Sequence, residues 1–388
     1  MNFDTYYERR NTRSVKWDLL QTVFQSEEVV PMWVADMDFQ APIEVQEALM
    51  ERVKHGIYGY TVIDQKVKDS IINWVSKRHQ WSIHPSWLLF SSGVIPSLYA
   101  AIRALTKLND KIMIQTPVYT PFYEMITKQR RQIVTNPLKL TNNRYEIDFA
   151  HFEEQLKTGV KAFILCSPHN PVGRVWREDE LRELARLCIK YNVLIFSDEI
   201  HCDLIYPGYR HIPIASLSEE IADNTITLMS PTKTFNLAGL QASYLIISNK
   251  NLRLQMKNEL KNQGFTTLNT MGITALEAAY NYGEPWLNEL IDVLTEHKQY
   301  VTTMFIDHQT GLEVIEAEGT YLLWINCQAL NLDAKSLRRF MIDEAKVGLS
   351  PGIEYGQEGE HFMRMNIACP KSTLQLGIER IIKAIHQK

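Results

Sequence analysis

Short apolar runs alternate with helical patterns through the middle of this chain, and that order constrains its fold more than any other feature. The helical patterns predict helices at 119–129, 148–157 and 178–191. The apolar runs predict strands at 111–115, 132–134, 161–166, 193–197 and 225–229. Strands that alternate with helices form right-handed βαβ units, so we expect an α/β fold with a mainly parallel central sheet covered by helices. Ligands of such a sheet bind beyond the carboxyl ends of its strands.

A different pattern occupies the C-terminal part of the chain. A long helical pattern runs from about 285 to 308, strand-like segments follow at 312–315 and 321–325, and a last helix begins near Ser372. This order predicts a smaller α+β lobe, against which we expect the N-terminal segment to pack. A chain of 388 residues is long enough for two domains. We expect a large domain at 43–285 and a small domain built from 1–42 and 286–388.

The composition is that of an ordinary globular protein, with 45% hydrophobic and 22% charged residues. A net charge of −4 argues against nucleic acid as the main partner. Five cysteines without a C-x-x-C pair indicate a reducing compartment, and neither a disulfide framework nor a zinc site. No signal-peptide pattern and no run of roughly 18 apolar residues is present, so we expect a cytoplasmic location without membrane contact.

Lys233 lies just after the predicted strand at 225–229, in the segment Ser230-Pro231-Thr232-Lys233. A lysine at a strand end can form a Schiff base with a carbonyl cofactor. A helix start disfavours a cation and lowers the pKa of its amine, which favours that chemistry. Taken alone, Lys233 is better interpreted as a surface lysine at a helix start.

Asp198 ends a second predicted strand and supplies the matching carboxylate. An ionised aspartate there can keep a pyridine nitrogen protonated, and this lysine–aspartate combination is what pyridoxal phosphate requires. His201, three residues later, either reaches the phenolic oxygen of the cofactor, braces Asp198, or is a structural histidine. Lys233 and Asp198 together predict pyridoxal 5'-phosphate as the cofactor.

A serine- and glycine-rich run at 91–97 precedes a helical pattern at 98–105. Backbone N–H groups at such a helix start bind anions, and the hydroxyls of Ser230 and Thr232 can supply further phosphate contacts. The chain contains neither a G-x-G-x-x-G nor a Walker A pattern, which argues against nicotinamide or ATP.

Three other residues have a functional and an ordinary interpretation. Asn170, between two prolines, is either a turn residue or an amide donor to the phenolate of the cofactor and a contact for the carboxylate of the substrate. Tyr119 is either a core aromatic or a ring that stacks on the pyridine. Arg364, in a strand-like run, is either half-exposed or a bidentate clamp for an α-carboxylate.

Four segments, taken in order, resemble one known family. They are PMWVADMDF at 31–39, HGIYGY at 55–60, SDEIH at 197–201 and KTFN at 233–236. Over essentially its whole length the chain resembles the MalY/PatB-type cystathionine β-lyases, or C–S lyases. These are fold-type I pyridoxal phosphate enzymes of the class I/II aminotransferase superfamily.

This resemblance implies a role for each cofactor-binding residue. Lys233 would hold the cofactor covalently, Asp198 would pair with its ring nitrogen, Asn170 would reach its phenolic oxygen and Tyr119 would stack on its ring. The phosphate would be held by the backbone of Gly93, Val94 and Ile95 and by the side chains of Ser230 and Thr232. Tyr60 would reach the phosphate of the other subunit, which implies a homodimer with composite sites.

The resemblance also implies the substrate contacts. Arg364 would bind the substrate carboxylate, helped by the backbone near Val34 and Ala35. Trp33, Tyr58 and Tyr321 can form an apolar pocket for the thiol substituent.

Two departures from the broader aminotransferase pattern favour the lyase branch. His201 replaces a tyrosine that many aminotransferases carry near the phenolic oxygen, and Gln241 replaces a phosphate-binding arginine. The role of the Gln241 amide stays open.

The implied reaction is α,β-elimination from cystathionine or another cysteine S-conjugate, giving a thiol, pyruvate and ammonia. Lys233 would remove the α-proton, and either Lys233 or Tyr119 would protonate the leaving sulfur. The alternatives are an aminotransferase, which shares the first half of this mechanism, and a pyridoxal phosphate-binding regulator. The preferred thiol substituent stays open.

Overall fold

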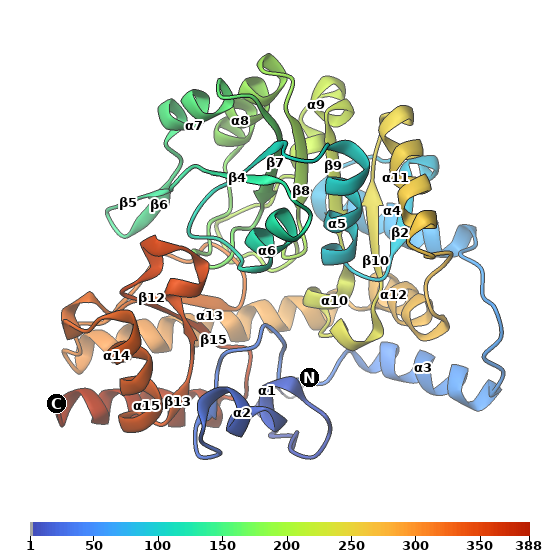
Figure 1. Cartoon of the computed structure of the whole chain (residues 1–388). Helices are drawn as coiled ribbons and strands as arrows, with labels where there is room; N and C mark the ends of the chain where they lie inside the picture. Colours follow the sequence, from blue (N-terminus) through green and yellow to red (C-terminus); the bar gives the residue numbers. More distant parts are fainter. Residues whose placement is uncertain (1–2) are drawn as a thin grey trace.

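The centre of the molecule is a seven-stranded sheet (Figure 1). The computed structural model describes residues 3–388; Met1 and Asn2, part of the N-terminus in which no leader is predicted, lie outside them. In spatial order the strands are β2 (Leu88–Ser91), β10 (Ser243–Ile246), β9 (Thr225–Met229), β8 (Leu194–Asp198), β7 (Val160–Cys166), β3 (Lys111–Ile114) and β4 (Gln132–Thr135). Only β10 is antiparallel to its neighbours, which confirms the predicted mainly parallel sheet.

Helices cover both faces of this sheet, because alternate residues of a strand point to opposite sides. Ile164 of β7 packs in a core that includes residues of α5 (Val94–Leu105), α6 (Pro121–Lys128) and α11 (Lys250–Asn262). Its neighbour Phe163 packs in another core with residues of α7 (Phe149–Leu156) and α8 (Glu178–Lys190). Both faces of β7 are therefore buried, as its continuous apolar sequence indicates.

A second, antiparallel sheet lies in the C-terminal part. Its strands are, in order, β11 (Glu313–Val314), β12 (Leu322–Asn326), β15 (Phe362–Asn366) and β14 (Ser350–Pro351). The long helix α13 (Glu284–Asp307) and the last helix α15 (Lys371–His386) follow the predicted pattern and pack against each other. β1 (Val30–Pro31) pairs in parallel with β13 (Val347–Gly348), so the N-terminal segment contacts this part of the chain as expected. The domain boundaries at 42/43 and 285/286 stay a prediction.

Several elements differ from the sequence-based expectation. α6 begins at Pro121 rather than at Tyr119, since proline suits a first helical position and Tyr119 is left in the preceding loop. α5 begins at Val94 rather than at Leu98. The helices that the prediction omitted include α3 (Ile43–His55), α4 (Gln65–His79) and α12 (Thr270–Tyr282). Within residues 3–388, no helix has both the length and the apolar character needed to cross a membrane.

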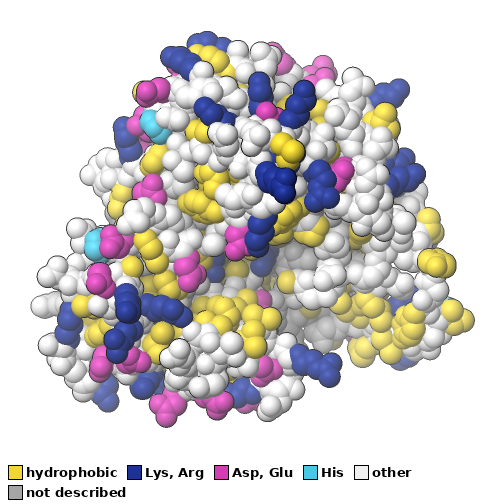
Figure 2. All heavy atoms as spheres, viewed as in Figure 1, with side chains coloured by type: hydrophobic (Ala, Val, Ile, Leu, Met, Phe, Trp, Pro, Cys, Tyr) yellow, Lys and Arg dark blue, Asp and Glu magenta, His cyan; other side chains and the backbone are white. Residues whose placement is uncertain are grey.

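One face of α3 and the segment after it exposes apolar side chains, while α3 also packs against α12. Figure 2 shows hydrophobic side chains gathered over this region, at the lower right. The exposed apolar residues are Ile43, Met50, Val53, Ile57, Tyr58, Tyr60 and Val62, and we call them the α3 patch. Apolar surface of this kind typically marks an interaction site.

Candidate active site

The carboxyl ends of β7, β8 and β9 lie side by side at one edge of the central sheet, because the three strands are parallel neighbours. A cavity of about 200 Å³ opens at this edge. Its lining residues are Ala35, Ser92, Gly93, Val94, Ile95, Pro96, Tyr119, Cys166, Asn170, Asp198, Ile200, His201, Thr232, Lys233, Ala238 and Gln241. The fold therefore brings together most of the predicted cofactor-binding residues.

Lys233 lies on the single-turn helix α10 (Pro231–Thr234). One residue, Ser230, separates this helix from the end of β9 and is its N-cap. The Nζ atom donates a hydrogen bond to the carbonyl oxygen of Ala35 at 2.5 Å. Burial, together with the charge of the nearby Arg364 guanidinium, lowers the pKa of the Lys233 amine to about 8. The amine therefore loses its proton more readily than an ordinary lysine.

Asp198 is the last residue of β8 and is buried. One carboxylate oxygen, Oδ1, accepts a hydrogen bond from the backbone N–H of Ile200 at 3.2 Å. Burial raises the pKa of the Asp198 carboxyl to about 7, although that hydrogen bond and the charge of Lys233 act in the opposite direction. A cation bound in the cavity would favour the ionised form of this group.

His201 lines the cavity with a ring that is 4% exposed. Its Nδ1 atom is buried without a hydrogen-bond partner among the described residues, and its ring lies edge-on to that of Tyr321 at 6.0 Å. Burial, together with the charges of Lys233 and Arg364, lowers the pKa of His201 to about 3. The ring is therefore neutral, and it can serve a polar ligand atom in the cavity.

The candidate anion site is the amino end of α5. Gly93 is the N-cap and supplies no side chain to the first N–H groups of this twelve-residue helix, and Val94 and Ile95 follow it along the cavity. Ser230 and Thr232 hydroxyls lie 2.7 Å apart, and Ser230 also donates to the carbonyl oxygen of Ala242. Thr232 lines the cavity, whereas Ser230 supports it from behind. Free backbone N–H groups and a positive helix end suit a phosphate.

Gln241 lines the same cavity. It ends a short 3-10 helix and adopts a left-handed backbone conformation, with φ of 52°. The cavity therefore has a neutral amide at this position, where many aminotransferases carry an arginine.

Arg364 reaches the site from β15 of the second sheet, and it is 5% exposed. Its guanidinium donates to Asn170 Oδ1 at 3.2 Å, to the Trp33 carbonyl oxygen at 2.7 Å and to Ser350 Oγ at 3.3 Å. Its Nε atom is buried without a partner among residues 3–388. The arginine thus lies next to Asn170, with a free donor for an acidic ligand.

Three predicted substrate residues have different positions. Tyr321 donates its hydroxyl to the Ala35 carbonyl oxygen at 2.9 Å, beside the Lys233 amine. The indole N–H of Trp33 donates to the Lys16 carbonyl oxygen at 3.1 Å, and the hydroxyl of the exposed Tyr58 donates to the Val53 carbonyl oxygen at 3.3 Å. None of these three aromatic residues lines the cavity in the single chain, and neither do Arg364 and the exposed Tyr60.

The prediction omitted five lining residues: Ser92, Pro96, Cys166, Ile200 and Ala238. Cys166 is the last residue of β7, and the other four lie within three positions of another lining residue. Proximity along the chain to predicted site residues, or to a strand end, was the sequence signal that could have found them. Burial raises the pKa of the Cys166 thiol, which makes it an inert wall residue.

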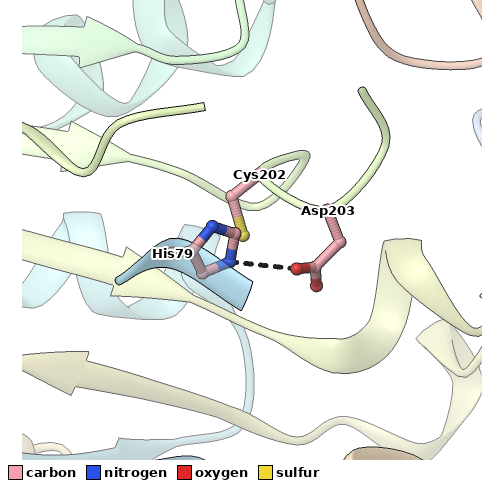
Figure 3. Close-up of side chains that lie close together, drawn as sticks. All are labelled: His79, Cys202 and Asp203. Atoms are coloured by element: carbon pink, nitrogen blue, oxygen red, sulfur yellow. Dashed lines mark ion pairs between the residues drawn. The ribbon is translucent and has the colours of Figure 1, made fainter. Parts of the chain in front are cut away.

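The loop after Asp198 has two sides. His201 faces the cavity, whereas Cys202 and Asp203 lie against His79 at the end of α4 (Figure 3). His79 Nε2 is 3.0 Å from Asp203 Oδ1, and both side chains are buried.

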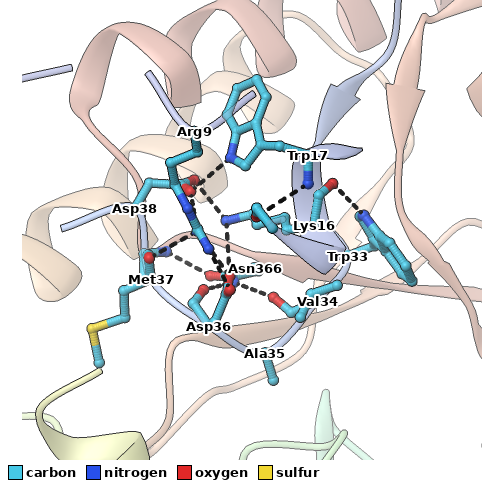
Figure 4. Close-up of polar contacts among 12 residues, drawn as sticks. Arg9, Lys16, Trp17, Trp33, Val34, Ala35, Asp36, Met37, Asp38 and Asn366 are labelled. Carbon is cyan, nitrogen blue, oxygen red and sulfur yellow. Dashed lines mark hydrogen bonds and ion pairs between the residues drawn. The ribbon is translucent and has the colours of Figure 1, made fainter. Parts of the chain in front are cut away.

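A partly buried charge cluster fixes the segment at 33–38 on which Ala35 lies (Figure 4). Arg9 pairs with Asp36 at 2.7 Å and with Asp38 at 2.6 Å, and the fully buried Lys16 pairs with Asp38 at 2.6 Å. Asn366 donates to the carbonyl oxygens of Val34 and Asp36, both at 2.6 Å. These bonds hold the backbone whose carbonyls accept from Lys233 and Arg364.

Comparison with known proteins shows the family of the chain. Residues 27–381 match the family described as aminotransferase class I and II. The cystathionine β-lyase PatB of Bacillus subtilis is 44% identical to this chain over 386 residues, covering 99% of this chain and all of PatB.

Two crystal structures share the whole fold. Cystalysin from Treponema denticola, which contains a pyridoxal 5'-phosphate cofactor, is 38% identical with a TM-score of 0.97, covering 100% of this chain and 99% of cystalysin. The pyridoxal phosphate-bound C–S lyase of Staphylococcus hominis, complexed with the inhibitor L-cycloserine, is 32% identical with a TM-score of 0.93, covering 100% of both chains.

Proposed function

We propose, from the premise that this chain belongs to the aminotransferase class I and II family, that it is a carbon–sulfur β-lyase dependent on pyridoxal phosphate. Its reaction is α,β-elimination from cystathionine or another cysteine S-conjugate to a thiol, pyruvate and ammonia. One observation carries the proposal: the Lys233 amine and the Asp198 carboxylate lie at adjacent strand ends and face one cavity.

The residues of the cavity fit this cofactor. Lys233 supplies the amine for the covalent link, Asp198 the partner of the ring nitrogen, and the amino end of α5 the phosphate site with Ser230 and Thr232. The unpartnered His201 Nδ1 and the amide of Asn170 serve the phenolic oxygen, and Tyr119 lies at the ring face. When bound, pyridoxal phosphate withdraws electrons from the α-carbon of an amino acid.

Lys233 is the group that moves the α-proton. A pKa of about 8 leaves a useful fraction of its amine neutral near pH 7, as a general base requires. Two groups can protonate the departing sulfur: Lys233 after it has taken the α-proton, and Tyr119, since burial raises the pKa of the Tyr119 hydroxyl to about 12 and keeps it protonated.

Arg364 binds the carboxylate of the substrate. Its fork-shaped guanidinium suits a carboxylate, and its free Nε supplies a donor. The backbone at Val34 and Ala35 borders the same place, and Tyr321 lies beside it. The apolar surface for the thiol substituent is assigned to Tyr321, Trp33 and Tyr58, all three of which lie outside the lining of the cavity in one chain.

A second copy of the chain covers the α3 patch and completes the site. Tyr60 is fully exposed within this patch and is not a lining residue of the active-site cavity in its own chain. In a homodimer its hydroxyl is available to the phosphate of the partner site, where Gln241 brings no positive charge. The five free, buried cysteines favour a reducing compartment, which supports a cytoplasmic location.

Elimination is distinguished from amino transfer by the keto-acid acceptor, which only amino transfer needs. Purified holoenzyme is incubated with cystathionine and no keto-acid, and pyruvate and free thiol are measured. The lyase releases both in equal amounts with multiple turnovers. Product that forms only after a keto-acid acceptor is added would identify an aminotransferase.

A further inference from the structure

Asp203 is a fully buried carboxylate that the proposed chemistry does not use. Its Oδ2 atom accepts a hydrogen bond from Thr234 Oγ1 at 2.8 Å, and Trp74 Nε1 lies 3.2 and 3.3 Å from its two oxygens. His79 Nε2 lies 3.0 Å from Oδ1, without the alignment of a linear hydrogen bond. Thr234 follows Lys233 directly on α10. The hydrogen bond to Asp203 therefore fixes the position of the turn that carries the lysine.

Glu199 makes an equivalent set of bonds next to Asp198. Its Oε1 atom accepts from Ser197 Oγ at 2.7 Å and from the backbone N–H of Ile214 at 3.3 Å. Its Oε2 atom lies 2.9 Å from Nε2 of the buried His211. Ser197 and Glu199 flank Asp198, so this pair holds the strand end that carries the aspartate.

The two histidine–carboxylate pairs touch each other. The rings of His79 and His211 lie edge to face with centroids 5.4 Å apart. Both histidines line a second cavity of about 510 Å³, which shares no lining residue with the active-site cavity. The pairs therefore form a wall behind the active site and connect the ends of β8 and β9 across it.

Part of this wall has a second interpretation, as a metal-binding site. Ligand-type atoms of His79, Cys202 and Asp203 lie within 4.8 Å of one another (Figure 3). However, both oxygens of Asp203 already lie within bonding distance of Thr234 or Trp74 donors. Burial also raises the pKa of the Cys202 thiol well above its usual range, whereas a metal requires the thiolate. The contacts favour a hydrogen-bonded wall.

We propose that the pairs His79–Asp203 and His211–Glu199 are positioning residues that hold Lys233 and Asp198 at a fixed separation. The inference rests on the proposed function only in assigning those two residues to the cofactor. Misplacement of a reacting group by about 1 Å can cost about a hundredfold in rate. Loss of one buried bond to α10 therefore affects the chemistry more than the binding of substrate.

Thr234→Val tests the proposal, because it removes the bond to Asp203 with little change in shape. Thr234→Ser keeps a hydroxyl and serves as the rescue. Thr225→Val is the matched control: Thr225 is buried at the opposite end of β9, and its hydroxyl bonds to the Ile221 carbonyl oxygen at 2.7 Å. For each holoenzyme we would measure Tm, kcat and KM, and the pH midpoint of the visible absorbance of the lysine-linked cofactor.

The positioning role predicts that Thr234→Val moves the pH midpoint and lowers kcat about tenfold with KM within about twofold. Thr234→Ser should restore both, and Thr225→Val should lower Tm alone. If Thr234→Val only lowers Tm, as the control does, the pairs are merely structural and the proposal fails. A shifted midpoint in a protein that cleaves no S-conjugate would leave the positioning role intact and reject the lyase.

His211→Leu and His211→Gln extend the test to the second pair, since only glutamine can still donate to Glu199. The midpoint should shift in the leucine variant and return towards that of the wild type in the glutamine variant. Elemental analysis of the wild-type holoenzyme completes the test. One equivalent of a transition metal that is lost in Cys202→Ser, but kept in Cys188→Ser, would overturn the hydrogen-bonded wall.

Discussion

Lys233 Nζ lies 2.5 Å from the carbonyl oxygen of Ala35, although 198 positions separate the two residues. The bond connects the turn after β9 to the N-terminal segment that the Arg9, Lys16, Asp36 and Asp38 cluster holds in place. The amine thus has a defined direction before any ligand enters. Formation of a covalent link to the cofactor would replace this hydrogen bond.

Replacing Lys233 with alanine removes the amine on which the proposed chemistry depends. We expect loss of the visible absorbance of the lysine-linked cofactor and loss of turnover. Borohydride reduction followed by peptide mass spectrometry should find a pyridoxyl adduct on Lys233 in the wild type. Lys190→Ala, at an exposed lysine that pairs with Glu153, should behave as the wild type. An adduct on any other lysine would place the covalent link elsewhere.

Asp198 predicts how the stability of the cofactor-free protein depends on pH. Because burial raises its folded-state pKa to about 7 from 3.8, the folded state binds more protons than the unfolded state between these values. The free energy of unfolding should therefore fall as pH rises from about 4 to about 7, by up to roughly 4 kcal/mol from this group. Denaturant titrations at several pH values should show a flatter profile for Asp198→Asn; an equal slope in both proteins would contradict the assignment.

Arg364→Lys keeps the charge and removes the fork-shaped donor set. We expect KM for an S-conjugate to rise about tenfold or more, with a smaller change in kcat, because the loss falls mainly on carboxylate binding. Steady-state kinetics measure both. Arg338→Lys, at an exposed arginine that bonds to the Val23 carbonyl, is the control. An unchanged KM would remove Arg364 from the carboxylate site.

Tyr60→Ala tests whether active sites are shared between subunits. The variant should remain dimeric but bind the cofactor more weakly than the wild type. Tyr282→Ala, at another exposed tyrosine, should bind the cofactor as the wild type does. Neither Tyr60→Ala nor Lys233→Ala alone should have full activity. Mixing and refolding the two should restore activity, because one site of the heterodimer then has Lys233 and a Tyr60 from the other subunit. Absence of restoration in verified heterodimers would reject the shared site.

Tyr119→Phe separates the two candidates for protonating sulfur. If the hydroxyl donates the proton, kcat should fall about a hundredfold for conjugates with poor leaving thiols and much less for good ones. The absorbance of the bound cofactor should persist, since the ring is kept. A uniform small effect across leaving groups would assign that proton to Lys233.

Residues at strand ends were predictable because a local pattern defines them. The apolar runs at 193–197 and 225–229 became β8 and β9, and their neighbours Asp198 and Lys233 followed. The prediction omitted β2 and β10, since β10 is antiparallel to both of its neighbours and does not follow the alternation of parallel strands and helices on which the prediction relied. The start of α6 was misplaced by two residues because the helical pattern does not reveal that Pro121 takes the first position.

The sequence by itself determined the main strands of the parallel sheet and the positions of Asp198 and Lys233 at two strand ends, since each depends on a local pattern of residues. Only the tertiary structure decided which distant groups meet them. Ala35 lies 198 positions from its partner Lys233, and Arg364 lies 194 positions from Asn170. It likewise decided that the Lys233 amine has a pKa of about 8, because burial and the Arg364 charge arise only when the second sheet packs against the first.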